Sequence, residues 1–174
     1  MSQETPPRWD LESIYPGLDA EAFRRDLQRV REGLDALDAY LDAEGIGRDG
    51  PVPAEDAALA ERVGEVIART NALLTLHGTL RAYVHGIVTT DSYNTAARRM
   101  QSELEALEVR LERQEVRFRG WIGRVAEDPA RLDRALATPG AAGAHAFYVR
   151  ETAEQSKYLM PEAEEALAAE ISLS

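Results

Sequence analysis

The three histidines are the side chains of this sequence best suited to bind a metal ion or to transfer protons. His77 and His85 are eight residues apart in a helix-like segment, which corresponds to about 12 Å of rise and roughly 80° of rotation. One ion cannot bridge side chains so placed, because zinc–nitrogen bonds are about 2 Å long. His145 follows an Ala/Gly-rich stretch. We therefore interpret all three as surface or partly buried histidines.

The motifs of common metal and nucleophile sites are absent from the sequence. Neither His77 nor His85 is followed by glutamate, so H-E-x-x-H does not occur, and no glutamate lies three residues before a histidine. The absence of cysteine excludes thiolate zinc sites, Fe–S clusters, disulfides and cysteine nucleophiles. Walker, dinucleotide-binding and G-x-S-x-G patterns are also missing. The sequence therefore predicts no catalytic, cofactor-binding or metal-binding residue in this chain.

Glutamates and arginines alternate along the polar side of residues 92–126. Their alternation predicts ion pairs along the solvated face of one helix, and we prefer this self-pairing to an anion-binding role for the arginines. A glycosidase-like carboxylate pair is the alternative, although no cleft or raised pKa is indicated. The charged residues concerned are Glu103, Glu108, Glu112, Glu115, Arg110, Arg113, Arg117, Arg119 and Arg124.

The 174-residue chain is strongly acidic, with a net charge of −11 when histidine is neutral. Such a surface repels phosphate backbones and anionic lipids, so nucleic acid and membrane surfaces are poor candidate partners. The N-terminus lacks the basic-then-apolar pattern of a signal peptide, and no apolar run approaches the ~20 residues that span a bilayer. We therefore expect a cytoplasmic location.

Heptad-like spacing of apolar residues predicts three long helices, at residues 19–44, 54–88 and 92–126. Asp19 is the expected N-cap of the first helix, and residues 45–53 form the clearest loop. The short connection after the second helix makes the second and third helices antiparallel neighbours. The predicted fold is all-α, with a long antiparallel helical hairpin and a third long helix packed beside it.

The second predicted helix has a broad apolar face, which includes Leu74 and suggests contact with more than one neighbour. Gly64, Gly78 and Gly86 interrupt it, and close approach of another helix or a kink would explain them. The apolar stripe of the third helix begins at Tyr93.

Shorter helices are predicted after residue 126. One runs over 129–137 with Asp128 as its cap, another over 144–155, and a last one begins at Pro161. Residues 1–18 are expected to be an irregular segment that its large apolar side chains pin onto the helices. The domain organisation is therefore 1–18, then 19–126, then 127–174.

Several segments together resemble the oligoendopeptidase F family, which are zinc metallopeptidases related to thimet oligopeptidase. Trp9-Asp10-Leu11 followed by Ile14-Tyr15-Pro16 resembles the family's W-D-L-x-x-I/L-Y-P segment. Residues 83–91 (YVHGIVTTD) resemble its turn between two long helices. Residues 157–165 (KYLMPEAEE) and 167–172 (LAAEIS) resemble a later acidic segment and its continuation. The resemblance is collinear over nearly the whole chain.

The resemblance implies a parent protein with two helical lobes around a deep channel, which admits only short, flexible peptides. This chain would be the N-terminal, non-catalytic part that walls the channel, and residues 127–174 would continue into the catalytic region. The family's zinc site, an H-E-x-x-H helix plus a further glutamate, would lie downstream, so no catalytic residue can be assigned to residues 1–174. The implied partners are that downstream region and, through the parent, oligopeptide substrates.

Two alternatives stay open at the level of sequence. The chain could be a stand-alone helical interaction or scaffolding module that uses its apolar stripes to bind partner helices. A truncated lobe would also expose apolar surface and could dimerise through it. On the peptidase interpretation, zinc belongs to the parent and the isolated chain hydrolyses nothing.

Overall fold

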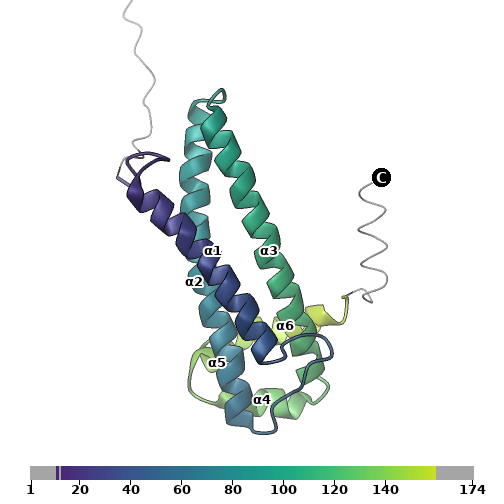
Figure 1. Cartoon of the computed structure of the whole chain (residues 1–174). Helices are drawn as coiled ribbons and strands as arrows, with labels where there is room; N and C mark the ends of the chain where they lie inside the picture. Colours follow the sequence, from purple (N-terminus) through teal and green to yellow (C-terminus); the bar gives the residue numbers. More distant parts are fainter. Residues whose placement is uncertain (1–10, 12, 160–174) are drawn as a thin grey trace, which may run out of the picture. The chain divides into compact units, whose positions relative to one another are not determined.

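The computed structural model describes Leu11 and residues 13–159, and this part of the chain contains helices and no strands (Figure 1). The prediction of an all-α fold is confirmed. The helices are α1 (Glu21–Ala43), α2 (Asp56–Thr90), α3 (Thr95–Val125), α4 (Pro129–Ala137), α5 (Ala141–Ala144) and α6 (Ala146–Ser156). Within the described residues, no helix is both long enough and apolar enough to cross a membrane.

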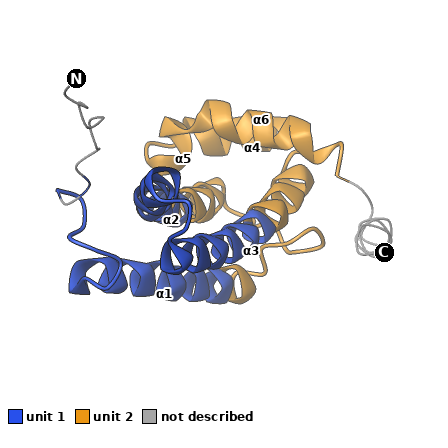
Figure 2. Cartoon of the chain, turned by 90° about the horizontal axis from the view of Figure 1, so that it is seen from above, with its two compact units in different colours: residues 1–40, 68–114 blue, residues 41–67, 115–174 orange. Residues whose placement is uncertain are grey.

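The chain divides into two compact units that are not consecutive in sequence (Figure 2). Unit 1 comprises residues 1–40 and 68–114, and unit 2 comprises residues 41–67 and 115–174. Unit 1 therefore takes most of α1, the second part of α2 and the first part of α3. Unit 2 takes the other ends of these helices together with α4, α5 and α6.

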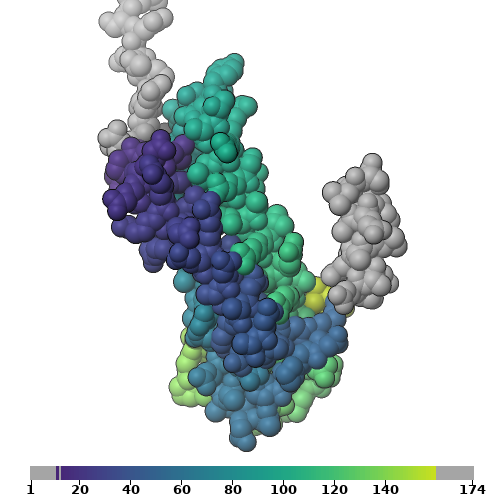
Figure 3. Space-filling model, in the orientation of Figure 1, coloured from purple at the N-terminus to yellow at the C-terminus, as the bar shows by residue number. Residues whose placement is uncertain are grey.

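Unit 1 is built from three long helical segments with a shared apolar core. Figures 1 and 3 show α1 lying along the hairpin that α2 and α3 form. The heptad-like residues of α1 are almost fully buried, as the spacing predicted. The largest buried core residues of unit 1 are Phe23, Val30, Leu34, Leu37, Leu80, Tyr83, Val84, Leu104 and Leu111.

The hairpin turn lies later in the sequence than predicted. Thr89 and Thr90 extend α2, and their hydroxyls donate to the carbonyls of His85 and Gly86 at 2.9 and 2.7 Å. The third helix begins at Thr95 rather than at residue 92, because Asn94 Oδ1 accepts the N–H of Ala97 at 3.0 Å and caps it. Asp91 and Ser92 belong to the turn.

Tyr93 and Leu74 were predicted to lie on apolar helix faces, and both predictions were wrong. Tyr93 lies in the turn with 91% of its surface exposed, and its backbone N–H donates to Asp91 Oδ1 at 3.1 Å. Leu74 is 46% exposed. The apolar face of α2 is therefore narrower at Leu74 than the sequence indicated.

Asp19 does not cap α1. The helix begins at Glu21, and its first backbone hydrogen bond runs from the N–H of Arg24 to the carbonyl of Ala20, so Ala20 occupies the cap position. A side-chain N-cap accepts from a backbone N–H two or three residues on. The Asp19 carboxylate accepts no such bond in the described structure, because the chain enters the helix one residue later than predicted.

Unit 2 begins where α1 ends, at a glycine that the sequence marked as the stop. Gly45 has φ 62°, its N–H donates to Asp42 O at 3.1 Å, and the N–H of Ile46 donates to Leu41 O at 2.7 Å. This is a Schellman cap, which favours glycine because its φ is positive. The following Ile46 is fully buried.

The loop between α1 and α2 is held by side chains of α3 within unit 2. Arg117 Nη2 donates to Ile46 O at 3.1 Å and pairs with Asp42 at 2.8 Å. Trp121 Nε1 donates to Pro51 O at 3.1 Å. Arg62 of α2 pairs with Glu44 at 2.6 Å. The loop is therefore fixed at several backbone carbonyls.

Gly50 is expected to tolerate no side chain in this loop. A Cβ there would overlap the carbonyl oxygen of Gly45, which is backbone and cannot rotate away. Gly50→Ala should lower the free energy of unfolding by about 1–3 kcal/mol. Urea denaturation followed by circular dichroism measures this. The control is Gly47→Ala in the same loop, where a Cβ meets nothing within 4 Å; equal stability of the two variants would refute the prediction.

The glycines of α2 have different surroundings. A Cβ on Gly64 would lie 3.2 Å from Ala141 Cβ of α5, and one on Gly86 would lie 2.8 Å from Leu11 Cδ1. Gly78 has nothing within 4 Å. Close approach of another segment therefore explains Gly64 and Gly86 and does not explain Gly78.

Three helices follow α3 in unit 2, and the first has the predicted bounds. Pro129 begins α4, and Asp128 Oδ1 accepts the N–H of Arg131 at 3.1 Å, so the predicted cap is confirmed. The predicted helix over 144–155 is instead the single turn of α5 and then α6, with His145 between them. The helix predicted from Pro161 lies outside the described residues.

Candidate functional site

The three histidines, all within the described residues, do not come together as ligands of a metal ion. His77 is 5% exposed, and its Nε2 lies 2.9 Å from the carbonyl oxygen of Leu104 in unit 1. Because a carbonyl oxygen can only accept, Nε2 is the donor in this contact. His85 and His145 are exposed. Within residues 11 and 13–159, no three His, Cys, Asp or Glu side chains gather closely enough to hold a metal ion.

Several charged residues of α3 pair with residues of other helices. In unit 1, Arg110 contacts Asp38 at 3.0 Å through Nε and Asp35 at 2.7 Å through Nη1. These two carboxylates raise the pKa of Arg110 further above its usual value, chiefly through the hydrogen bond that Arg110 donates to Asp38. The prediction of self-pairing was therefore wrong for Arg110, because its side chain reaches α1.

The same pattern holds for two glutamates of α3. Glu103 pairs with Arg31 of α1, and Glu108 pairs with Arg81 of α2 at 2.9 Å. These pairs follow the seams between helices in unit 1, where Figure 3 shows α1 against α3. The charges of these residues are balanced inside the unit, which argues against both the anion-binding and the carboxylate-pair interpretations for them.

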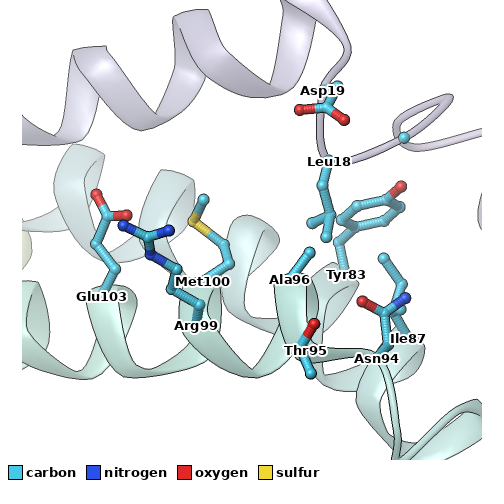
Figure 4. Close-up of a pocket in the computed structure, with 11 residues that line it drawn as sticks. Leu18, Asp19, Tyr83, Ile87, Asn94, Thr95, Ala96, Arg99, Met100 and Glu103 are labelled. Carbon is cyan, nitrogen blue, oxygen red and sulfur yellow. The ribbon is translucent and has the colours of Figure 1, made fainter.

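A cavity of unit 1 lies where the segment just before α1 meets the hairpin (Figure 4). Its volume is about 910 Å³, within the range of roughly 300–1,000 Å³ typical of small-molecule sites. Leu18, Tyr83, Ile87 and Met100 give it apolar walls, and Tyr83 is only 3% exposed. The sequence analysis did not single out this cavity.

Two side chains of opposite charge border this cavity. Asp19 comes from the segment before α1 and Arg99 from α3, and Figure 4 shows Asp19 next to Leu18 at one end of the lining and Arg99 beside Met100 and Glu103 at the other. Neither charged group has an ion-pair partner in the described structure. Glu103, four residues after Arg99, is paired with Arg31. Glu103 also borders the cavity, so its charged lining consists of this paired carboxylate together with Arg99 and Asp19, which are left for a ligand.

The sequence carried little signal for this site. Arg99 is one of two adjacent arginines, and Asp19 resembles an ordinary capping residue. Whether Arg99 and Asp19 border the same cavity depends on where residues 17–19 cross the hairpin. The periodicity of apolar residues does not determine that position. The one signal in the sequence is that Arg99 stands next to the apolar stripe of α3. Its acidic neighbour four residues on, Glu103, is used by Arg31.

A cluster of three aromatic rings forms the structural centre beside this cavity. Tyr15 contacts Phe23 and Tyr83 edge-on, with ring centroids 5.3 and 5.1 Å apart. Its hydroxyl donates to Asp26 Oδ2 at 3.0 Å. Burial and then this hydrogen bond raise the pKa of Tyr15 to about 12. Both effects favour the neutral phenol.

The stability of the chain is expected to fall between pH 10 and about 12 because of Tyr15. The unfolded chain releases the Tyr15 proton near pH 10, whereas the folded chain holds it until about pH 12. The stabilisation is therefore complete below pH 10 and is lost as the pH rises from 10 to about 12. Urea denaturation at several pH values measures the loss. Tyr15→Phe is the control and should show a shallower decline. Identical pH profiles for the two chains would contradict the prediction.

Comparison of the chain with protein-family models, with curated proteins and with solved structures finds no match.

Proposed function

We propose that this chain is the N-terminal, non-catalytic helical region of a cytoplasmic zinc-dependent oligoendopeptidase. Its helices wall the substrate channel and restrict it to short peptides, while zinc and the catalytic residues belong to a downstream region of the same polypeptide. The proposal starts from the resemblance of residues 9–16, 83–91 and 157–165 to the oligoendopeptidase F family.

One structural observation supports this proposal above others. Two of the segments that carry the resemblance are far apart in sequence and lie together in unit 1. Tyr15 of the first segment packs on Tyr83 of the second at 5.1 Å between ring centroids. Leu11 lies so close to Gly86 that a Cβ there would be 2.8 Å from Leu11 Cδ1. Segments that pack on one another are constrained together, which gives their joint occurrence a physical reason.

The coding sequence downstream of the Ser174 codon provides the first test. The proposal expects an open frame that reaches H-E-x-x-H and a later glutamate, because a zinc peptidase needs two histidines on one helix face, a third ligand and a carboxylate that activates water. A stop codon directly after Ser174 would overturn the proposal.

A peptidase assay tests the division of labour. The 174-residue chain with added zinc is expected to leave a nine-residue peptide intact, whereas the full polypeptide should cleave it. The full polypeptide should also leave an unfolded protein of a hundred residues largely uncut, because the channel limits access. The control is the full polypeptide with glutamine in place of the H-E-x-x-H glutamate. Zinc-dependent cleavage by the short chain would contradict the proposal.

A stand-alone interaction module is the alternative function, and exposed aromatic residues on unit 2 favour it. Phe147 on α6 and Tyr158 just beyond it are 80% and 85% exposed, whereas soluble surfaces usually carry few large apolar groups together. The same residues would be covered by downstream chain in the peptidase. Light scattering of the 174-residue chain, of Phe147→Ser and of the full polypeptide distinguishes the two. Concentration-dependent association that the substitution abolishes and that persists in the full polypeptide supports the module, whereas association of the 174-residue chain alone supports a face that downstream chain covers.

A further inference from the structure

The cavity of unit 1 presents an arrangement that suits a particular kind of small molecule. Arg99 on α3 and Asp19 before α1 border it at different ends of its lining, together with apolar side chains (Figure 4). A ligand that satisfies both charges must carry an anion at one end, a cation at the other and an apolar middle. We propose that this cavity binds ω-amino carboxylates, that is, amphipathic zwitterions whose carboxylate pairs with Arg99 and whose ammonium pairs with Asp19.

The anionic end of such a ligand has one suitable partner. Arg99 is exposed and carries no ion pair in the described structure, and Glu103, the nearest acidic residue along α3, is paired with Arg31. A guanidinium accommodates a carboxylate through two parallel hydrogen bonds.

The cationic end has Asp19. Its carboxylate caps no helix and forms no ion pair in the described part of the chain, since only its backbone carbonyl is engaged, by Arg24. The half-buried Leu18, Ile87 and Met100, which also line the cavity, supply apolar surface for methylene groups. A ligand with a single charge would leave one of the two side chains unpaired.

The affinity is expected to be modest and to depend on length. Both charged side chains are exposed, so each ion pair contributes little, and we expect a dissociation constant on the order of a millimolar. Because two fixed charges define one span, affinity should pass through a maximum as the ligand lengthens. This inference concerns unit 1 alone and does not rest on the proposed peptidase.

The experiment is an NMR titration of the 174-residue chain with 4-aminobutanoate, 6-aminohexanoate, 8-aminooctanoate and 11-aminoundecanoate. We expect amide shifts around residues 18–19 and 94–100, with one length binding best. Hexanoate and hexylamine, which carry one charge each, should bind about fivefold more weakly than the best zwitterion. Absence of shifts at 20 mM ligand, or equal binding of hexanoate and the best zwitterion, would overturn the inference.

Variants test the assignment of the two charges. Arg99→Gln should weaken the best zwitterion about fivefold and leave the binding of the alkylamine unchanged, and Asp19→Asn should do the converse. Arg98→Gln is the matched control, because Arg98 neighbours Arg99 on α3 but does not border the cavity. Circular dichroism confirms that each variant is folded. Equal effects of Arg98→Gln and Arg99→Gln would show that binding follows general surface charge, and would refute the site.

Discussion

Replacing Trp121 by alanine is expected to lower the free energy of unfolding by about 3–5 kcal/mol. Trp121 is the largest fully buried side chain of the described structure and packs near Phe118, with ring centroids 6.3 Å apart. Its removal leaves a cavity in unit 2 and also frees the carbonyl of Pro51, which loses the indole donor at 3.1 Å. Urea denaturation followed by circular dichroism at 222 nm measures the change.

A second substitution separates the two contributions of Trp121. Trp121→Phe keeps an aromatic ring in the core and removes the N–H donor, so it should cost about 1–3 kcal/mol, chiefly for the unpaired carbonyl and the partial cavity. The order of stability should therefore be wild type, then Trp121→Phe, then Trp121→Ala. An alanine variant as stable as the phenylalanine variant would show that the ring does not fill the core as described.

The elements that the sequence predicted well are those set by local chemistry. Gly45 ends α1 because a positive φ is needed there, and Asp128 and Pro129 begin α4 through a cap and a fixed φ. These signals act within a few residues, so they do not depend on the rest of the fold. The start of α3 was less certain because Asp91, Ser92 and Asn94 are all good capping residues, and the structure uses Asn94.

Features that depend on how helices face one another could not be predicted from spacing. Arg110 has no acidic residue three or four positions away on its own helix, and it pairs instead with Asp35 and Asp38 of α1. The choice depends on the rotation of α3 against α1, which the sequence alone does not determine. The cavity beside Arg99 has the same origin, since its other side is a segment that precedes α1.

Gln114 was overlooked although a signal for it existed. It lies between Leu111 and Phe118, three residues after one and four before the other, and thus within the apolar stripe. The residue is 2% exposed, and its Nε2 donates to the carbonyl of Leu34 at 2.9 Å. Its Oε1 is buried without a hydrogen-bond partner in the described structure. A polar residue at a stripe position is therefore better interpreted as a buried interhelical contact than as surface.

Replacing Phe23 by alanine is expected to destabilise the chain by about 3–5 kcal/mol, as Trp121→Ala does in the other unit. Phe23 is fully buried and its ring lies 5.3 Å from that of Tyr15 and 5.7 Å from that of Tyr83. Phe23→Leu keeps most of the apolar volume and should cost clearly less. Urea denaturation of both variants measures the difference, and equal losses would contradict the packing described.

The double variant of Phe23 and Tyr15 tests whether the aromatic cluster acts as one unit. Rings in contact share their packing, so the loss in Phe23→Ala/Tyr15→Ala should be smaller than the sum of the single losses, by about 0.5–1.5 kcal/mol. Phe23→Ala combined with Trp121→Ala is the control, because these residues belong to different units and should be closer to additive. Additive losses for Phe23 and Tyr15 would mean that Tyr15 packs independently of Phe23, and the contact with Tyr83 and the hydrogen bond to Asp26 would then hold the first segment.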